Sequence, residues 1–353
     1  MTAATPPAPK PDPRALDVEA TAAAIRAGDR AMLARAITLV ESTKPAHQAP
    51  AAELLQAINK DTGQAHRIGI TGVPGVGKST TIDQFGIDLI EAGHRVAVLA
   101  VDPTSSRSGG SILGDKTRMN RLAINPDAFV RPSPTSGTLG GVARKTRETM
   151  ALVEAAGFDI VIVETVGVGQ SETTVADMVD TFVVLLLPGG GDELQGIKKG
   201  IIELADLIAI NKADGDNVAR AERSAADYRA ALGLLTPASA NWQPPVLAVS
   251  GLTGQGLDAL WAQIRSHRDR LTATGEFQAR RQAQAVRWLH DMLSDEMRRL
   301  MLGEAAVGAV LERVEAAVHT GDMAPTAGVR EVIDAFIAAL TSGARPAPDN
   351  QQT

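Results

Sequence analysis

The stretch Gly72-Val73-Pro74-Gly75-Val76-Gly77-Lys78-Ser79 fits the pattern G-x-x-x-x-G-K-[ST]. An apolar run at 67–71 leads into it, and the residues from Ser79 onward can open a helix. Glycines let successive N–H groups point into one hollow, and a helix N-terminus adds positive potential, so this stretch and Thr80 are predicted to bind phosphate groups. Lys78 would meet the terminal phosphates, and Ser79 would ligate Mg²⁺. The alternative is a glycine-rich turn with a chance Lys-Ser pair, which the strand and helix context disfavours.

Short apolar and β-branched runs alternate with stretches long enough for helices. The runs lie at 67–71, 95–101, 158–164, 181–187, 206–210 and 246–249. This alternation predicts an α/β fold with a doubly wound, mainly parallel sheet. Ligands of such a sheet bind at the carboxyl ends of its strands, so we expect functional residues directly after these runs.

Acidic residues stand where two of these runs end. Asp102 comes after the second run, and Glu164 is the last residue of the third, where it begins an E-x-x-G element that ends at Gly167. Glu164 would orient Mg²⁺-bound water, and the N–H of Gly167 would meet a γ-phosphate. Asp102, and Asp115 in the glycine- and serine-rich loop beyond it, are further metal candidates. For Asp102 the alternative is a turn before a proline.

The residue after Gly167 is Val168, where Ras-like GTPases carry the glutamine that positions water. Gln170 is the nearest glutamine, at a different offset. We therefore expect slow intrinsic hydrolysis that a partner accelerates.

Asn211-Lys212-Ala213-Asp214 follows the run at 206–210 and fits N-K-x-D. An aspartate carboxylate accepts hydrogen bonds from N1–H and the 2-amino group of guanine, which adenine cannot offer, and the lysine stem would pack along the base. Ser250-Gly251-Leu252 follows the last run and would close over guanine. N-K-A-D alone is compatible with an ordinary turn. The order of phosphate loop, metal aspartate, E-x-x-G and N-K-x-D, each after a predicted strand, instead favours binding of GTP and GDP, with in-line attack of water on the γ-phosphate.

A glycine-rich loop follows the run at 181–187. It is predicted to be a hinge or third switch that includes Gly189, Gly190, Gly191, Gln195, Lys198 and Lys199. A flexible loop that caps a helix is an equally open alternative.

Composition excludes several classes of protein. The chain of 353 residues has no cysteine, so disulfides, thiolate zinc sites and iron–sulfur clusters are excluded, and its six histidines show no paired metal spacing. With 35 Lys plus Arg against 41 Asp plus Glu, the formal net charge of −6 argues against a general nucleic-acid binder. No apolar run reaches the length of a bilayer span, and the N-terminus lacks the apolar core of a secretion signal. We expect a cytoplasmic protein with no membrane or nucleic-acid partner.

Five segments are expected along the chain. A flexible tail at 1–14 precedes a helical arm at 15–62, a P-loop GTPase domain at 63–275, a helical segment at 276–341 and a second tail at 342–353. The segment at 276–341 shows three amphipathic helices and no catalytic cluster, which favours a dimerisation or docking module. Packing of these helices back onto the sheet domain is the alternative.

The motifs together resemble the MeaB and methylmalonic aciduria type A group of metallochaperone-type P-loop GTPases, formerly labelled ArgK or LAO/AO transport kinase. The resemblance rests on the stretches that begin at Gly72, Val101, Gly110, Val163 and Asn211. It implies a homodimeric GTPase chaperone of an adenosylcobalamin-dependent acyl-CoA mutase, usually methylmalonyl-CoA mutase, which gates cofactor loading and protects or reactivates the mutase. It also implies that the region from Gly189 to Lys199 is a third switch. Ser250-Gly251 departs from the frequent Ser-Ala, but glycine still provides the backbone N–H.

The sequence leaves three other functions to compare with this one. A nickel-insertion GTPase would normally carry Cys or clustered His, which this chain lacks. A kinase would need an acceptor pocket, and none is identifiable in the sequence. A GTP-binding module without appreciable hydrolysis stays open, because no residue is identified that positions the attacking water.

Overall fold

The computed structural model describes residues 17–101, 119–132, 139–165, 171–189, 199–233 and 238–343. The chain divides into two compact units, Met1–Gln284 and Ala285–Thr353. Each unit is described by itself below.

The first unit is built on a seven-stranded sheet in which every neighbouring pair of strands is parallel. The strand order is β3-β2-β4-β1-β5-β6-β7. The strands are β1 (His66–Gly72), β2 (Val96–Val101), β3 (Ala128–Arg131), β4 (Ile160–Thr165), β5 (Thr181–Leu186), β6 (Leu207–Ile210) and β7 (Val246–Ala248). The predicted doubly wound α/β fold is confirmed. The sequence analysis did not identify β3, which forms one edge of the sheet.

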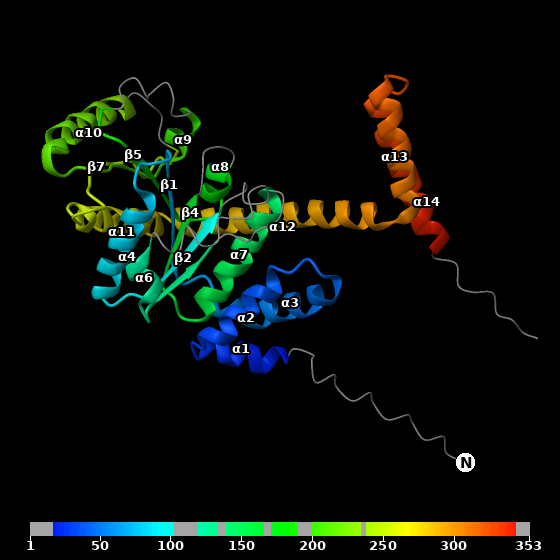
Figure 1. Cartoon of the computed structure of the whole chain (residues 1–353), viewed down its shortest axis with the longest axis horizontal. Coiled ribbons are helices and arrows are strands. Elements are labelled where there is room, and N and C mark those ends of the chain that lie inside the picture. The colour runs from blue at the N-terminus through cyan, green and yellow to red at the C-terminus, as the bar shows by residue number, and fades with distance from the viewer. Residues whose placement is uncertain are drawn as a thin grey trace, which may run out of the picture. The chain divides into compact units, whose positions relative to one another are not determined.

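Helices cover both faces of this sheet (Figure 1), because the strands alternate their side chains between two cores. In β4, Val161 and Val163 enter one core while Ile160 and Ile162 enter the other. The first core is covered by α1 (Val18–Arg26), α2 (Arg30–Val40), α3 (Pro45–Ile58), α7 (Leu139–Ala155), α8 (Ser171–Ala176), α9 (Lys199–Leu204) and α10 (Val218–Leu232). The second is covered by α4 (Lys78–Glu91), α6 (Asn120–Ile124) and α11 (Leu257–Ala273).

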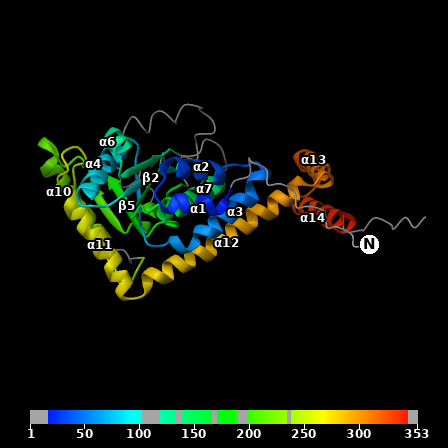
Figure 2. The ribbon, with the colours of Figure 1, turned by 90° about the horizontal axis from the view of Figure 1, so that it is seen from below.

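The N-terminal helices belong to the first core and lie beside α7 (Figure 2). Asp17 and Asp29 begin α1 and α2, because their carboxylates accept hydrogen bonds from N–H groups of the first turn. Ile25, Leu33 and Leu54 are fully buried there. The helices at 18–58 therefore contribute side chains to the core of the sheet unit.

The helix α12 (Glu276–Gly303) begins in the first unit, after Gly275. Its first turns are held at the amino ends of the strands. Arg281 pairs with Asp180, Arg280 pairs with Asp206, and the amide of Gln284 donates to the carbonyl of Val179 at 2.8 Å. The boundary between the units falls after Gln284, where these contacts end.

In the second unit, α13 (Ala305–Thr320) and α14 (Pro325–Gly343) pack together around Val307, Val314 and Val332. Large apolar side chains are exposed along α12 and α14: Val286, Leu289, Leu293, Met297, Leu300, Val329, Ile333, Ile337 and Leu340. None of the described helices combines the length and the apolar character that crossing a bilayer requires.

Candidate nucleotide site

The predicted phosphate loop joins β1 to α4. β1 ends at Gly72 and α4 begins at Lys78, so the loop stands at the carboxyl edge of the sheet. Gly77 begins the helix with φ +96°, and a Cβ atom there would lie 2.8 Å from Nδ2 of Asn211. Only glycine combines this backbone angle with such a close approach. Thr80, three residues after Gly77, is exposed on the first turn of α4.

Lys78 folds back over the loop. Its Nζ donates to the carbonyl oxygen of Gly72 at 2.7 Å and to that of Val73 at 3.4 Å. Burial lowers the pKa of Lys78, while the charges of Glu164 and Glu172 oppose that shift. The ammonium group therefore lies inside the loop, with carboxylates near enough to stabilise its charge.

Ser79 and Glu164 lie together, although 85 residues separate them. The Ser79 hydroxyl donates to Oε1 of Glu164 at 3.1 Å. Glu164 is 3% exposed and lies in β4, in register with Ile70 of β1 and Ala100 of β2. A buried carboxylate beside a hydroxyl is the oxygen donor set that a hard cation prefers, so these two residues fit Mg²⁺. The described residues contain no cluster of three or more His, Cys, Asp or Glu side chains arranged for a metal.

Asn211 connects the phosphate loop to the loop after β7. Its Nδ2 donates to the carbonyl oxygen of Val76 at 2.7 Å, and its Oδ1 accepts from the N–H of Gly251 at 2.9 Å. Asp214 is held by the hydroxyl of Ser250, which donates to Oδ2 at 2.5 Å. The structure thus brings together the three sequence segments that were predicted to bind nucleotide.

Two exposed residues flank this arrangement. Lys212 has φ +61°, a left-handed angle that no other non-glycine residue among those described adopts, and its side chain is exposed. Leu252 is 73% exposed. Neither side chain belongs to a core, so both are available to contact a base.

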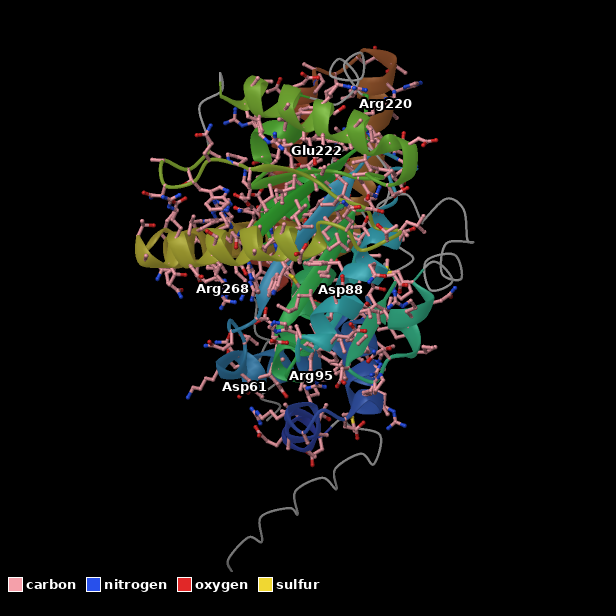
Figure 3. All side chains as sticks on the ribbon, turned by 90° about the vertical axis from the view of Figure 1, so that its left-hand side faces the viewer. Asp61, Asp88, Arg95, Arg220, Glu222 and Arg268 are labelled. Atoms are coloured by element: carbon pink, nitrogen blue, oxygen red, sulfur yellow. The ribbon has the colours of Figure 1, made fainter. Side chains whose placement is uncertain are left out.

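The predicted third switch is described only at its two ends. Gly189 follows β5, and its N–H donates to the hydroxyl of Ser224 at 2.8 Å. Arg220 stands on the first turn of α10 (Figure 3) and lies against Gly189. A Cβ atom at position 189 would lie 2.1 Å from the guanidinium of Arg220. Lys199 begins α9. Seven other predicted site residues lie outside the described residues: Asp102, Asp115, Gly167, Gly190, Gly191, Gln195 and Lys198.

The sequence analysis assigned no role to Thr81, Thr71 or Thr165, three buried threonines of this region. The hydroxyls of Thr71 and Thr165 are 2.7 Å apart, next to Gly72 and Glu164 in the chain. Thr81 accepts a hydrogen bond from Asn211. The available signal was position alone, since Thr81 stands three residues after Lys78 and so on the same turn of a predicted helix.

A family profile described as "Methylmalonyl Co-A mutase-associated GTPase MeaB" matches residues 33–306. The chain belongs to the MeaB family of GTPases. This agrees with the resemblance found in the sequence, and membership supports hydrolysis of GTP at a P-loop site.

Relatives of the MeaB family show the same similarity over most of the chain. A "Putative GTPase" of Caulobacter vibrioides is 62% identical, over 91% of this chain and 98% of its own. The "Methylmalonic aciduria type A homolog, mitochondrial" of Mus musculus is 46% identical, over 88% and 77%. The crystal structure of a "LAO/AO transport system kinase" is 41% identical and covers 91% of this chain and 97% of its own, with a TM-score of 0.72. The family and its fold therefore extend across both units of the chain.

Proposed function

We propose that this chain hydrolyses GTP as the chaperone of an adenosylcobalamin-dependent acyl-CoA mutase, with methylmalonyl-CoA mutase as the first candidate. It would gate cofactor loading and protect or reactivate the mutase. The observation that carries the nucleotide part of the proposal is the set of hydrogen bonds of Asn211, which link the phosphate loop to Gly251. The family description, which names a mutase-associated GTPase, supports the client.

In this proposal each described side chain has one task. Lys78 binds the terminal phosphates, and the carboxylate of Asp214, oriented by Ser250, accepts from guanine. The stem of Lys212 and the main chain at Leu252 contact the base. Water attacks the γ-phosphate in line, and the N–H of Gly167 donates to that phosphate.

Ser79 and Glu164 would hold Mg²⁺, with Asp102 and Asp115 as further ligands. The bound ion supplies positive charge beside the phosphates. Because no glutamine follows Gly167, we propose slow hydrolysis that the mutase accelerates, with the region from Gly189 to Lys199 as the segment that reports the nucleotide state.

We further propose that two copies of the chain associate through the helical segment at 276–341. Leu289, Leu293, Met297 and Leu300 recur at helical spacing along α12 and are each about half exposed, between 48% and 58%. A second copy would offer the same stripe, which is the self-complementary arrangement that a two-fold dimer uses. The cytoplasm remains the proposed location.

The test is GTP hydrolysis by the purified full chain, alone and with methylmalonyl-CoA mutase, with ATP as control substrate. Slow GTP-selective turnover that rises with the mutase supports the proposal. Turnover that the mutase leaves unchanged would refute the chaperone role and leave a GTPase with another client, such as a metalloenzyme that receives nickel. The variant Asp214→Asn should weaken the preference for GTP over ATP, and intact preference would show that the guanine site is placed wrongly.

A further inference from the structure

Thr81 lies at the junction of the phosphate loop and the proposed guanine site. It stands on the first turn of α4, where its N–H donates to the carbonyl of Gly77 at 2.9 Å, and it is fully buried. Its Oγ1 lies 3.0 Å from Nδ2 of Asn211 and accepts a hydrogen bond from it. Thr81 thus belongs to the turn that carries Lys78 and Ser79, and it contacts the N-K-x-D segment directly.

The amide of Asn211 has every polar group in use. One N–H of Nδ2 donates to Val76 and the other to Thr81, while Oδ1 accepts from Gly251. Because Asn211 is only 2% exposed, water cannot replace a hydrogen-bond partner that a substitution removes. The two acceptors on one side and the donor on the other fix which way the amide faces.

Gly251 approaches Thr81 more closely than any other residue type would allow. A Cβ at position 251 would lie 2.3 Å from Oγ1 of Thr81, 2.7 Å from its Cα and 2.9 Å from its N. The last two are backbone atoms of a helix, so a change of rotamer would not relieve the clash. The glycine that replaces the frequent alanine in Ser-Ala is therefore matched to Thr81.

The loop that Gly251 begins also orients Asp214. The Ser250 hydroxyl donates to Asp214 and accepts from the N–H of Thr253 at 3.1 Å. Displacing Gly251 would shift Ser250 and, with it, the carboxylate of Asp214. The position of that carboxylate relative to the phosphate loop thus depends on the contact between Thr81 and residues 211 and 251.

We propose that Thr81 is a positioning residue for guanine recognition, which holds Asn211 and the loop at Gly251 at a fixed distance from the phosphate loop. This inference rests on the proposed guanine site at residues 211–214 and 250–252. It assigns Thr81 no contact with the nucleotide. Its effect should therefore appear in the selectivity between bases rather than in the binding of phosphates.

The test measures dissociation constants of GDP and ADP for four full-length proteins: wild type, Thr81→Val, Thr81→Ser and Asp214→Asn. Valine keeps the volume and removes the acceptor, whereas serine keeps the acceptor. We expect Thr81→Val to weaken GDP binding about tenfold, which corresponds to about 1.4 kcal/mol, and to leave ADP binding unchanged. For Thr81→Ser the preference for GDP over ADP, taken from the two dissociation constants, should stay within about twofold of wild type, because serine keeps the hydrogen bond.

Equal weakening of GDP and ADP binding by Thr81→Val, or no weakening, would overturn the inference. Should Thr81→Val fail to fold, Gly251→Ala tests the same contact from the other side, and a wild-type ratio in that variant would also overturn it. The Asp214→Asn variant separates this inference from the proposed function. A preference for GDP over ADP that falls with Asp214→Asn and not with Thr81→Val refutes only the role of Thr81, while a preference unchanged by Asp214→Asn refutes the guanine site itself.

Discussion

Replacing Asp180 by asparagine should destabilise the first unit strongly. Asp180 stands before β5, and its side chain is 1% exposed. Nε and Nη2 of Arg281 donate to its two oxygens at 2.7 and 2.6 Å, and the N–H of Arg67 donates to Oδ2 at 2.8 Å. Arg281 also donates to the carbonyl oxygens of Gly63 and Ala65. One carboxylate therefore joins the start of β1, the start of β5 and the first turns of α12.

The expected cost follows from what the substitution leaves behind. Arg281, only 11% exposed, would keep its charge but lose the carboxylate to which it donates two hydrogen bonds. Removing one partner of a buried ion pair costs about 3 to 5 kcal/mol. For a unit of this size each kcal/mol lowers the melting temperature by roughly 2 to 4 °C, so we expect a fall of about 10 °C.

Thermal and urea denaturation followed by circular dichroism measure this loss. The matched control is Asp61→Asn, because Asp61 (Figure 3) also pairs with an arginine, Arg26, but the two side chains are 34% and 40% exposed. Such an exposed pair is worth at most about 1 kcal/mol. A loss for Asp180→Asn no larger than that of the control would refute the reasoning.

The stability difference between wild type and Asp180→Asn should also depend on pH. Burial by itself would raise the pKa of Asp180, but the hydrogen bonds and charges of Arg281 and Arg67 outweigh burial and lower it. A carboxyl whose pKa is lower in the folded protein stabilises it above the unfolded value of about 3.9, and this contribution is lost as pH falls through the folded pKa. The difference in stability between wild type and Asp180→Asn should be constant from pH 7 to 5 and shrink below about pH 4. A difference that grows on acidification would contradict this assignment.

Three further predictions concern the proposed site and the helical segment. Lys78→Ala should weaken GTP binding about 100-fold and leave the melting temperature unchanged, because it removes the only described ammonium inside the phosphate loop. Calorimetric titration with GTP measures the loss of affinity. Glu164→Gln should lower the apparent affinity for Mg²⁺, measured as the concentration that half-saturates GTP hydrolysis, by about tenfold, since an amide replaces the charged partner of Ser79. Leu293→Glu should convert the proposed dimer into a monomer, as measured by sedimentation velocity. The control is Ser294→Glu at the neighbouring exposed position, which should leave the dimer intact. A dimer that persists in Leu293→Glu would exclude this part of α12 from the interface.

The sequence correctly predicts the strand, loop and helix around Lys78, because there the signals are local. Glycines and Lys78 lie in one continuous stretch, and the strand before it and the helix after it are both strongly patterned. The contact between Ser79 and Glu164 was predicted only as a shared metal site, since Ser79 follows one predicted strand and Glu164 ends another in the same parallel sheet. Chemistry at the ends of parallel strands can thus be placed from the order of the strands alone.

The parts that the sequence does not reveal depend on pairs of residues far apart in the chain. β3 has only four residues, Ala128–Arg131, and no alternating pattern, so nothing marks it as a strand before it pairs with β2. Asp180 and Arg281 are 101 residues apart, and each alone reads as a solvated surface charge. Thr81 reads as an ordinary helix residue until Asn211 is seen beside it.

The two ends of the sheet can be examined separately because its strands are parallel. β1, β5 and β6 begin at the contacts of Arg280 and Arg281 with Asp206 and Asp180. β1 ends at the phosphate loop, and β6 ends at the N-K-x-D segment. β5 ends shortly before Gly189. Strands of four to seven residues, at about 3.3 Å per residue, place these ends roughly 13 to 23 Å apart, too far for direct contacts between side chains of the two ends. We therefore expect Asp180→Asn to lower the stability of the first unit, and Thr81→Val to lower the proposed selectivity for guanine.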